Sequence, residues 1–289
     1  MKDLSIIIPH YNCPKKLKRL LFTIDMFRED GIYDKTEVIV VDDNSTKDIL
    51  ELKQLGQQYP EVKFIFAEKN KGAGAARNIG LKEATGKWVL FADSDDYFNE
   101  DMWAAVSANF MAKEDIILFP PTSVIDETNI LADRHRESAR IVSSILDEHD
   151  EKAELNARYM MTLNLSRMIR RELIEHNQIR FDESMRYFED AIFAMECGHV
   201  AEIIGARKTI IYCITQSKDS ETYKDDETSD LLRRKCSYLR AKRLCDLLTP
   251  HQQEVLNAGK GLVLKRYNDY KRTAVSKAMY KSYLMTHKY

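Results

Sequence analysis

Short apolar runs alternate with helix-like stretches in the first part of the chain, and this alternation limits the folds that are open to it. The runs at 4–8, 37–41, 62–68 and 87–93 have the length and the apolar content of buried strands. Strands that are apolar almost throughout, with a helix between each pair, form mostly parallel sheets whose two faces are covered by helices. The sequence therefore predicts an α/β fold with a mostly parallel central sheet.

Apolar spacing predicts the remaining elements. Leu17, Leu21 and Ile24 recur at the spacing of an amphipathic helix, whereas the stretch 122–150 predicts no defined element. The other expected elements are a helix at 49–55 capped by Ser45 or Thr46, helices at 73–85 and 100–111, a strand at 115–120, a mainly helical stretch at 151–200, one or two strands at 201–215, and helices beyond residue 228.

Polar clusters directly follow three of the expected strands. Side chains at i and i+2 leave a strand on the same side, so Asp93 and Asp95 of Asp93-Ser94-Asp95-Asp96 can face one point beyond the sheet. Mg²⁺ and Mn²⁺ prefer oxygen ligands, and Mg²⁺ takes one or two carboxylates with water and substrate phosphates. The cluster therefore predicts a divalent cation site, with an ordinary acidic loop as the alternative. In parallel sheets ligands bind beyond the carboxyl ends of the strands, where the three clusters would meet.

The charge balance argues against one class of partner and leaves another open. The formal net charge is −2 over 289 residues, whereas nucleic-acid-binding proteins usually carry a basic excess. From Lys260 onward, however, the Lys and Arg residues are opposed only by Asp269. This basic tail favours either contact with an anionic membrane surface or a solvated helix face, and both interpretations stay open.

Cysteine usage and the absence of long apolar runs bear on the compartment. Five cysteines without a C-x-x-C pair predict neither a disulfide framework nor structural zinc, which favours a reducing compartment. The first residues have no signal-peptide layout, and no apolar run reaches the ~18 residues of a membrane span. We therefore expect a cytoplasmic protein, which the basic tail could bring to the inner face of the cell membrane.

Five motifs occur in order within residues 4–215, namely SIIIPHYN, VIVVDDNSTKD, NKGAGAARN, FADSDD and FEDAIF. Together they resemble the motifs of the inverting family 2 glycosyltransferases, which have the GT-A fold, and their joint occurrence is far more specific than any one of them. The resemblance implies a GT-A, Rossmann-like glycosyltransferase domain at 1–215, with a nucleotide-binding half at 1–120 and an acceptor-side half at 121–215. A helical C-terminal extension is expected at 216–289, and none of these motifs lies in the tail after Thr228.

The first three motifs hold the nucleotide in that family. By resemblance, Pro9 and Tyr11 line the base pocket, with the Tyr11 ring against a pyrimidine face. Asp43 would accept a hydrogen bond from the base, and Arg77 would lie near the base and the diphosphate. The alternatives are a rim aromatic for Tyr11 and a helix N-cap for Asp43. The glycines of NKGAGAARN would let the backbone pass close to the nucleotide, and Arg77 in place of a third glycine argues against a dinucleotide-binding loop.

The FADSDD motif supplies the ribose and cation contacts by the same resemblance. Asp93 would contact the ribose and bind the metal through water, Asp95 would ligate the metal directly, and Ser94 would line the nucleotide site. Asp96 would support the other two or cap the following turn. The expected cofactor is Mn²⁺ or Mg²⁺, and the expected donor is a UDP-sugar. No convincing further metal ligand is found among His199, His251 and His287.

The FEDAIF motif supplies the expected base. A metal can stabilise a diphosphate leaving group without a protein acid, but the acceptor hydroxyl must still lose its proton to a general base. By resemblance Asp190 is that base, and Glu189 orients the acceptor or the base. The alternative is that the helix dipole favours two carboxylates in a first helical turn. Less specific candidates for acceptor or phosphate contacts are three arginines, for which a solvated helix face is the alternative, and two serines: Arg167, Arg170, Arg171, Ser217 and Ser220. Four histidines are expected to be ordinary surface or rim residues: His10, His135, His149 and His176.

The expected function is metal-dependent, inverting transfer of a sugar from a UDP donor to a saccharide acceptor, free or lipid-linked, in bacterial polysaccharide synthesis. One rival is a sugar-1-phosphate nucleotidyltransferase. Such enzymes carry a Gly-rich loop directly after the first strand, where this chain has Pro9-His10-Tyr11-Asn12. The other rival is a non-catalytic sugar-nucleotide or glycan-binding module, which would need Tyr11 and Asp43 but not Asp190.

Overall fold

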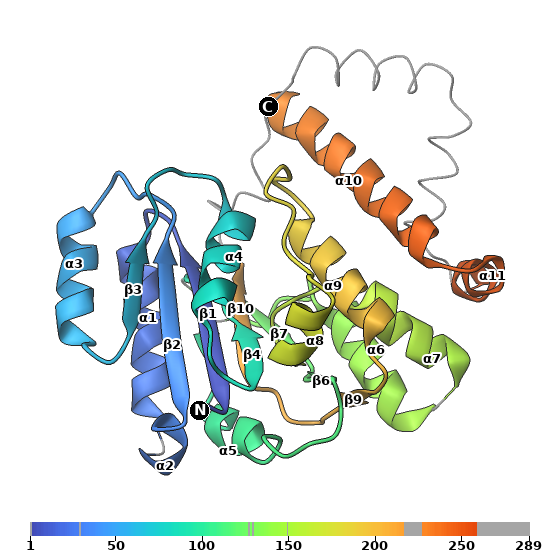
Figure 1. Ribbon diagram of the computed structural model, residues 1–289, viewed down its shortest axis with the longest axis horizontal. Helices are drawn as coiled ribbons and strands as arrows, with labels where there is room; N and C mark the ends of the chain where they lie inside the picture. The colour runs from blue at the N-terminus through green and yellow to red at the C-terminus, as the bar shows by residue number, and fades with distance from the viewer. Residues whose placement is uncertain are drawn as a thin grey trace.

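A computed structural model gives the structure of the protein and describes residues 2–28, 30–126, 128, 130–148, 150–216 and 227–258. Its centre is a seven-stranded sheet with helices packed around it (Figure 1). The strands lie in the order β3 (Lys63–Phe66), β2 (Thr36–Asp42), β1 (Leu4–His10), β4 (Trp88–Phe91), β8 (Arg167–Arg170), β6 (Ile116–Leu118) and β9 (Ile204–Ala206). Within the described ranges only β8 runs antiparallel to its neighbours in this sheet. The predicted mostly parallel α/β sheet is therefore confirmed.

The central strands are covered on both faces. Every residue of β1 and β4 is buried, and successive side chains of a strand point to opposite faces. Leu17, Leu20, Leu21 and Ile24 form the buried stripe of α1, as their spacing predicts. The helices between the first strands are α1 (Pro14–Met26), α2 (Asp30–Tyr33), α3 (Ile49–Gln58), α4 (Ala73–Glu83) and α5 (Met102–Ser107).

A second, three-stranded sheet lies beside the end of β4. Its order is β5 (Tyr97–Phe98), β10 (Tyr212–Gln216) and β7 (Thr122–Ile125). β10 pairs antiparallel with β5 and parallel with β7. Because β5 begins one residue after Asp96, this sheet fixes the acidic loop between the two sheets.

The segment between 122 and 200 departs from the sequence prediction at several points. β7 and α6 (Arg136–Asp147) lie in the stretch that predicts no element, and β8 lies in the stretch expected to be helical. Met168 and Ile169 of β8 are fully buried between β4 and β6, so tertiary pairing overrides the local helical pattern. The other elements are α7 (Glu151–Leu155), a π-helix η1 (Asn156–Met160), α8 (Arg171–His176) and α9 (Glu189–Val200).

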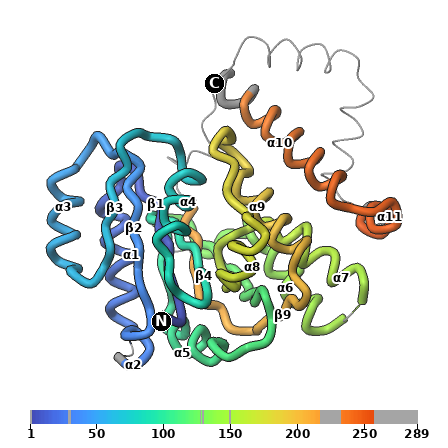
Figure 2. Tube along the Cα trace, in the orientation of Figure 1, coloured from blue at the N-terminus to red at the C-terminus, as the bar shows by residue number. Residues whose placement is uncertain are grey.

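The C-terminal part is helical in its described residues, as expected. α10 (Glu227–Leu247) runs beside α9 and leads to α11 (Pro250–Ala258), as the trace in Figure 2 shows. An apolar cluster joins these helices to the rest of the molecule and contains Leu155, Tyr159, Met195, Leu244, Leu248 and Leu256. The basic tail falls outside the described residues, and no helix in the described ranges is long and apolar enough to cross a bilayer.

Two smaller predictions have opposite outcomes. All five cysteines are free, which confirms that the chain has no disulfide framework. The expected capping of α3 by Ser45 or Thr46 is wrong, because the N-cap residue is Asp48 in a left-handed conformation with φ of 53°. Ser45 instead donates its hydroxyl hydrogen bond to Asp42.

Candidate active site

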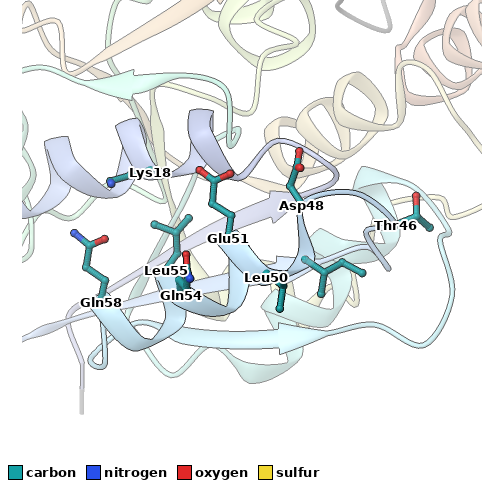
Figure 3. A pocket seen from close by; sticks show the side chains of 9 residues that line it. Lys18, Thr46, Asp48, Leu50, Glu51, Gln54, Leu55 and Gln58 are labelled. Atoms are coloured by element: carbon teal, nitrogen blue, oxygen red, sulfur yellow. The ribbon is translucent and has the colours of Figure 1, made fainter.

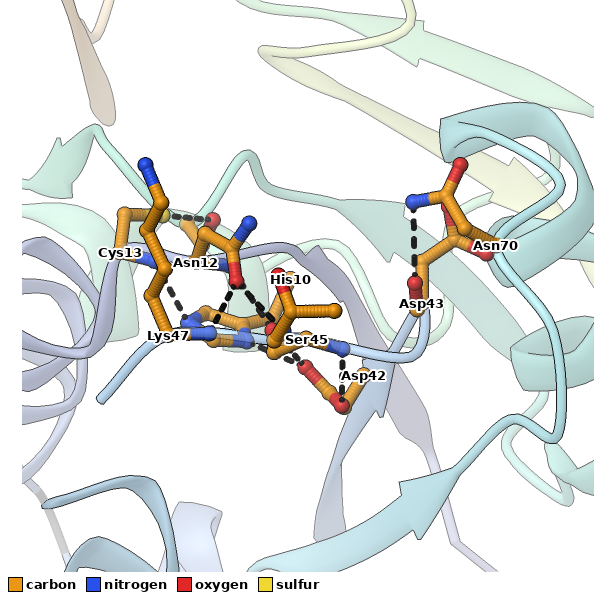
Figure 4. A network of polar contacts seen from close by, with 10 residues as sticks. His10, Asn12, Cys13, Asp42, Asp43, Ser45, Lys47 and Asn70 are labelled. Carbon is orange, nitrogen blue, oxygen red and sulfur yellow. Dashed lines mark hydrogen bonds and ion pairs between the residues drawn. The ribbon is translucent and has the colours of Figure 1, made fainter. Parts of the chain in front are cut away.

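A buried hydrogen-bond network joins the loops that follow β1 and β2 (Figure 4). Asp42, the last residue of β2, accepts hydrogen bonds from His10 Nδ1 at 2.8 Å, from Ser45 N at 2.9 Å and from Ser45 Oγ at 2.5 Å. Burial disfavours the ionised form of Asp42, but these hydrogen bonds lower the pKa of its carboxyl. The network therefore fixes the positions of the two loops relative to each other.

His10 and Asp42 were not identified as site residues from the sequence, and the prediction of a surface or rim position for His10 is wrong. Its side chain lies beside Asp42 because the two residues are paired in the register of β1 and β2, and His10 is only 2% exposed. The two consecutive aspartates at the end of β2 could have indicated a separate role for Asp42, because neighbouring side chains of a strand point to opposite faces. His135 is also buried, His176 is exposed as expected, and His149 lies outside the described residues.

Asn12 and Cys13 extend this network to the loop after β4. The Asn12 amide donates to Ser45 Oγ at 2.8 Å, and its side-chain oxygen accepts the backbone amides of residues 46 and 47. Asn12 has φ of 54°, a left-handed conformation that asparagine tolerates better than most residues. Cys13 Sγ lies 3.3 Å from Ser94 Oγ. The three polar clusters thus meet at one edge of the sheet, as their positions in the sequence predict.

Asp43 shapes the glycine loop before α4. Its carboxylate accepts the backbone amides of Lys71 at 2.8 Å and Gly72 at 2.7 Å, and Asn70 Nδ2 donates to its carbonyl at 3.0 Å. Gly72 has φ of 96°, which a residue with a side chain rarely adopts. The alternative of an N-cap for the helix that follows β2 is wrong. Each carboxylate oxygen keeps a lone pair for a base N–H, so the predicted base contact is compatible with this geometry.

The other two nucleotide candidates flank the same loops. Pro9 is buried within β1, and Tyr11 is 45% exposed at the start of the loop that follows. An exposed ring at this position suits stacking on a base and suits a rim aromatic equally well. The two assignments stay predictions.

Arg77 joins the acidic loop to the Glu-Asp motif. Its Nη2 donates to Asp93 at 2.7 Å and its Nη1 donates to Glu189 at 3.2 Å. Burial alone would lower the pKa of Arg77, but the charges of Asp93 and Glu189 raise it, so the guanidinium is a permanent cation. The side chain stands 5.4 Å from the centroid of the Phe181 ring.

The acidic loop holds three aspartates in different environments. Asp96 is 2% exposed, and its carboxylate accepts hydrogen bonds from Thr215 N at 2.7 Å and Tyr212 Oη at 2.8 Å, so it supports the loop. The backbone carbonyl of Asp95 accepts hydrogen bonds from Arg19 and Thr215. No other residue in the described part of the chain donates a hydrogen bond to the Asp95 carboxylate.

Asp93 and Asp95 suit a divalent cation. Burial, and then the charge of Asp93, raise the pKa of the Asp95 carboxyl, and a cation would favour its ionised form. No group of three or more His, Cys, Asp or Glu in the described ranges is arranged to hold a metal ion. A cation held by these two carboxylates would therefore need water and a ligand phosphate, which is how Mg²⁺ is commonly bound.

Glu189 and Asp190 begin α9 at the same site. Burial raises the pKa of both carboxyls, and in Glu189 the charge of Asp190 adds to this effect. Gly74 allows the approach of α4, because a Cβ at this position would lie 3.0 Å from Glu189 Cγ. Asn164 Nδ2 donates to the Asp190 carbonyl at 2.6 Å. Both carboxylates do lie in a first helical turn, as the alternative states, and Glu189 also contacts Arg77.

The arginines in and directly after β8, which precede the FEDAIF motif, hold the fold and are not a solvated helix face. Arg167 is buried and donates to the Met161 carbonyl at 2.5 Å, and burial lowers its pKa to about 10. Arg170 donates to the Glu114 carbonyl at 2.7 Å, and Arg171 donates to the Gly86 carbonyl at 2.8 Å. These arginines donate to backbone carbonyls because the segment forms the strand β8, which the sequence did not predict.

Several weaker candidates lie away from the site or outside the described residues. The ring nitrogen of His199 lies 2.9 Å from Tyr159 Oη, and His251 lies 3.2 Å from Glu151. Neither histidine contacts the acidic loop. Ser217, Ser220 and His287 fall outside the described ranges.

A hollow of about 610 Å³ lies between α1 and α3 (Figure 3). Its lining includes Lys18, Asp48, Glu51 and Gln54. None of the predicted site residues lines it. The converging loops, and not this hollow, therefore carry the chemistry that the residues allow.

Comparison with known sequences agrees with this geometry. Residues 5–177 match the sequence profile of Glycosyl transferase family 2. The chain is 28% identical over 222 residues to the poly(ribitol-phosphate) beta-N-acetylglucosaminyltransferase TarS of Staphylococcus aureus (strain Mu50), covering 76% of this chain and 37% of that protein. It is 26% identical to a poly(ribitol-phosphate) beta-glucosyltransferase of Bacillus spizizenii, covering 75% of this chain and 33% of that protein. The chain thus spans about a third of the length of these two relatives.

Comparison with solved structures supports the fold. The crystal structure of S. aureus TarS 1–349 in complex with UDP has a TM-score of 0.67 and 27% identity, covering 95% of this chain and 74% of that chain. The mannosyltransferase PcManGT of Pyrobaculum calidifontis, in complex with GDP-Man and Mn²⁺, has a TM-score of 0.62 at 17% identity and covers 99% of this chain and 76% of that chain. The second likeness concerns the fold alone. With the GT-A architecture and a profile match over more than half of its length, the chain belongs to glycosyl transferase family 2.

Proposed function

We propose that the protein transfers a sugar, with inversion, from a UDP-sugar to a hydroxyl group of a saccharide or polymer acceptor in bacterial surface-polysaccharide synthesis. The observation that carries the proposal is the pair of hydrogen bonds from Arg77 to Asp93 and Glu189. Through them the acidic loop and the Glu-Asp motif border one site. Family 2 membership favours this reaction over the nucleotidyltransferase rival.

The uridine donor rests on the nucleotide loops and on a relative. TarS, at 28% identity and a TM-score of 0.68, has been crystallised in complex with UDP-GlcNAc. In the present chain Tyr11 would stack on the base, and Asp43 would accept the base N–H from its place against the Lys71 and Gly72 amides. Pro9 and Ser94 would complete the lining of this side of the pocket.

Asp93 and Asp95 would hold a Mn²⁺ or Mg²⁺ ion together with the donor diphosphate. When bound, the ion would stabilise the negative charge that develops on the leaving diphosphate. Asp95 would be a direct ligand, and Asp93 would contact the ribose and reach the ion through water. The protein's own part is to hold this loop in place, which it does through Asp96 and through the Asp95 carbonyl.

Asp190 would act as the general base. As the acceptor oxygen forms its bond to the anomeric carbon, the bond from that carbon to the diphosphate breaks, and the hydroxyl proton passes to Asp190. Burial raises the pKa of the Asp190 carboxyl, which brings it closer to neutral pH and strengthens it as a base. Glu189, held by Arg77, would orient Asp190 or the acceptor.

Screening nucleotide sugars for Mn²⁺-dependent UDP release, followed by the Asp190→Asn variant, tests this proposal. Removal of a general base should slow turnover by a factor of about 10² to 10⁴, while the affinity for the UDP-sugar stays within twofold. Equal turnover in the variant and the parent would contradict the assignment of Asp190. A parent protein that binds UDP-sugars but transfers from none of them would favour the non-catalytic binding module.

The proposal extends to the acceptor and to the place of action of the enzyme. The two transferases compared above carry poly(ribitol-phosphate) in their names, which supports a polymer acceptor, and the basic tail supports a lipid-linked acceptor at the inner face of the membrane. We also propose the division into a glycosyltransferase domain at 1–215 and a helical extension at 216–289. Binding of the full chain to anionic vesicles, with neutral vesicles as control, tests the membrane contact.

A further inference from the structure

We propose that helix α10 of the C-terminal extension belongs to the catalytic apparatus, with Arg240 as a positioning residue for the segment that carries Glu189 and Asp190. The proposal rests on the proposed function for the role of these two carboxylates. Helix α10 lies in the C-terminal extension, which none of the five family motifs reaches.

The segment needs support because of its backbone conformation. Phe188, the residue directly before Glu189, has φ of 63° and ψ of 13° and forms the N-cap of α9 without a side-chain capping hydrogen bond. A bulky L-residue is rarely found in this left-handed region. Such a conformation persists only where the surrounding contacts hold it, and it sets the direction in which the first turn of α9 presents its carboxylates.

One face of α10 supplies contacts to this segment. The Arg240 guanidinium stands 4.5 Å from the centroid of the Phe188 ring, and the Arg233 guanidinium stands 5.7 Å from that of Tyr187. Between them Cys236 is 1% exposed, and its thiol lies against the backbone amide of Tyr187. Positions 233, 236 and 240 are three and four residues apart, so they share one face of the helix. Guanidinium groups over aromatic faces are attracted by the ring electrons.

α10 is fixed well enough to act as a support. Leu244 of α10 and Leu248, directly after it, pack with Met195 of α9 in one apolar cluster. Arg243 forms an ion pair with Glu196 of α9 at 2.7 Å. The arrangement of the two helices is visible in Figure 1. The aromatic contacts therefore connect the catalytic segment to an element that is itself anchored to α9.

Arg240 also acts on Asp190 through its positive charge. Burial raises the pKa of Asp190, whereas the positive charges of Arg77 and Arg240 act in the opposite direction. Arg240 thus favours the ionised carboxylate that a base requires. The contact with Phe188 and the charge near Asp190 act on one short segment.

The test uses Arg240→Met and Arg240→Lys in the full chain, with Lys242→Met as the matched control. The Lys242 side chain is 55% exposed on the same helix. Arg240→Met should increase amide hydrogen exchange at 187–191 and lower kcat about ten- to a hundredfold, with the donor KM within twofold of the parent. Arg240→Lys keeps the charge but loses the planar stacking group, so its kcat should lie between those of the parent and of Arg240→Met. Lys242→Met should match the parent in both measurements.

Unchanged exchange at 187–191 in Arg240→Met would overturn the proposal. So would faster exchange without any loss of kcat, because the contact would then be packing alone. Phe188→Leu provides a second variant if Arg240→Met fails to fold, and it should show the same rise in exchange. The exchange measurement needs no substrate, so a parent protein without transferase activity would count against the proposed function and leave this test standing.

Discussion

Arg77 illustrates how one side chain can set the geometry of a site. It is 5% exposed, and it binds carboxylates from two segments that are far apart in the sequence. The Arg77 cation is buried between the buried carboxylate of Glu189 and the partly exposed carboxylate of Asp93. Removal of its charge leaves the Glu189 carboxylate buried without compensation. The motif that contains Arg77 indicates its presence in the site, but its partner Glu189 is visible only in three dimensions.

Replacement of Arg77 by methionine should therefore destabilise the protein. We expect the free energy of unfolding to fall by about 3–5 kcal/mol, the cost of breaking a buried ion pair from one side, and this can be measured by urea denaturation. Lys82→Met is the control, because Lys82 lies on the exposed side of the same helix and such surface changes stay within about 0.5 kcal/mol. A loss as small as that of the control would show that Arg77 does not hold the two carboxylates together.

At the scale of elements, β10 determines where the acidic loop lies. Tyr212 of β10 donates to Asp96 at 2.8 Å, and its hydroxyl accepts the backbone amide of Asp93 at 2.8 Å. The sequence predicts strands in 201–215 but not their partners. Pairing of β10 with β5 and β7 depends on long-range contacts that apolar spacing does not encode.

The Tyr212→Phe variant tests this link. Removal of the hydroxyl leaves a buried carboxylate short of one donor, so the free energy of unfolding should fall by about 1–3 kcal/mol, as measured by chemical denaturation. Tyr59→Phe is the control, because the described part of the chain offers the Tyr59 hydroxyl no hydrogen-bond partner. If the two variants lose the same stability, β10 does not fix the acidic loop through Tyr212.

The helical pattern of 151–200 shows where local prediction fails. The string around Met168 has helix-forming neighbours on both sides, yet β8 is a buried strand between β4 and β6. Arg170 and Arg171 then donate hydrogen bonds to backbone carbonyls, and not to a ligand as predicted. A short strand at the centre of a sheet is decided by its neighbours in space, which a sequence pattern of a few residues cannot reveal.

At the scale of the whole molecule, the nucleotide half follows from the sequence more closely than the acceptor half. The first four strands, their helices and the meeting of three polar clusters were predictable because each strand ends directly in its motif. The buried pair of His10 and Asp42 was not, since only the register of β1 with β2 brings the two side chains together. The contact of α10 with the catalytic segment joins residues more than forty positions apart, and no local pattern indicates it.

In the proposed function, the loops after β1, β2 and β4 bind one nucleotide donor through a cation held by the acidic loop. Calorimetric titration of UDP, with and without Mn²⁺, into the parent and the Asp95→Ala variant tests this arrangement. We expect Mn²⁺ to strengthen UDP binding at least tenfold, about 1.4 kcal/mol, in the parent and to have no effect in the variant, whose thermal unfolding should match that of the parent. Equal Mn²⁺-dependent affinity in the two proteins would contradict a cation held by Asp95.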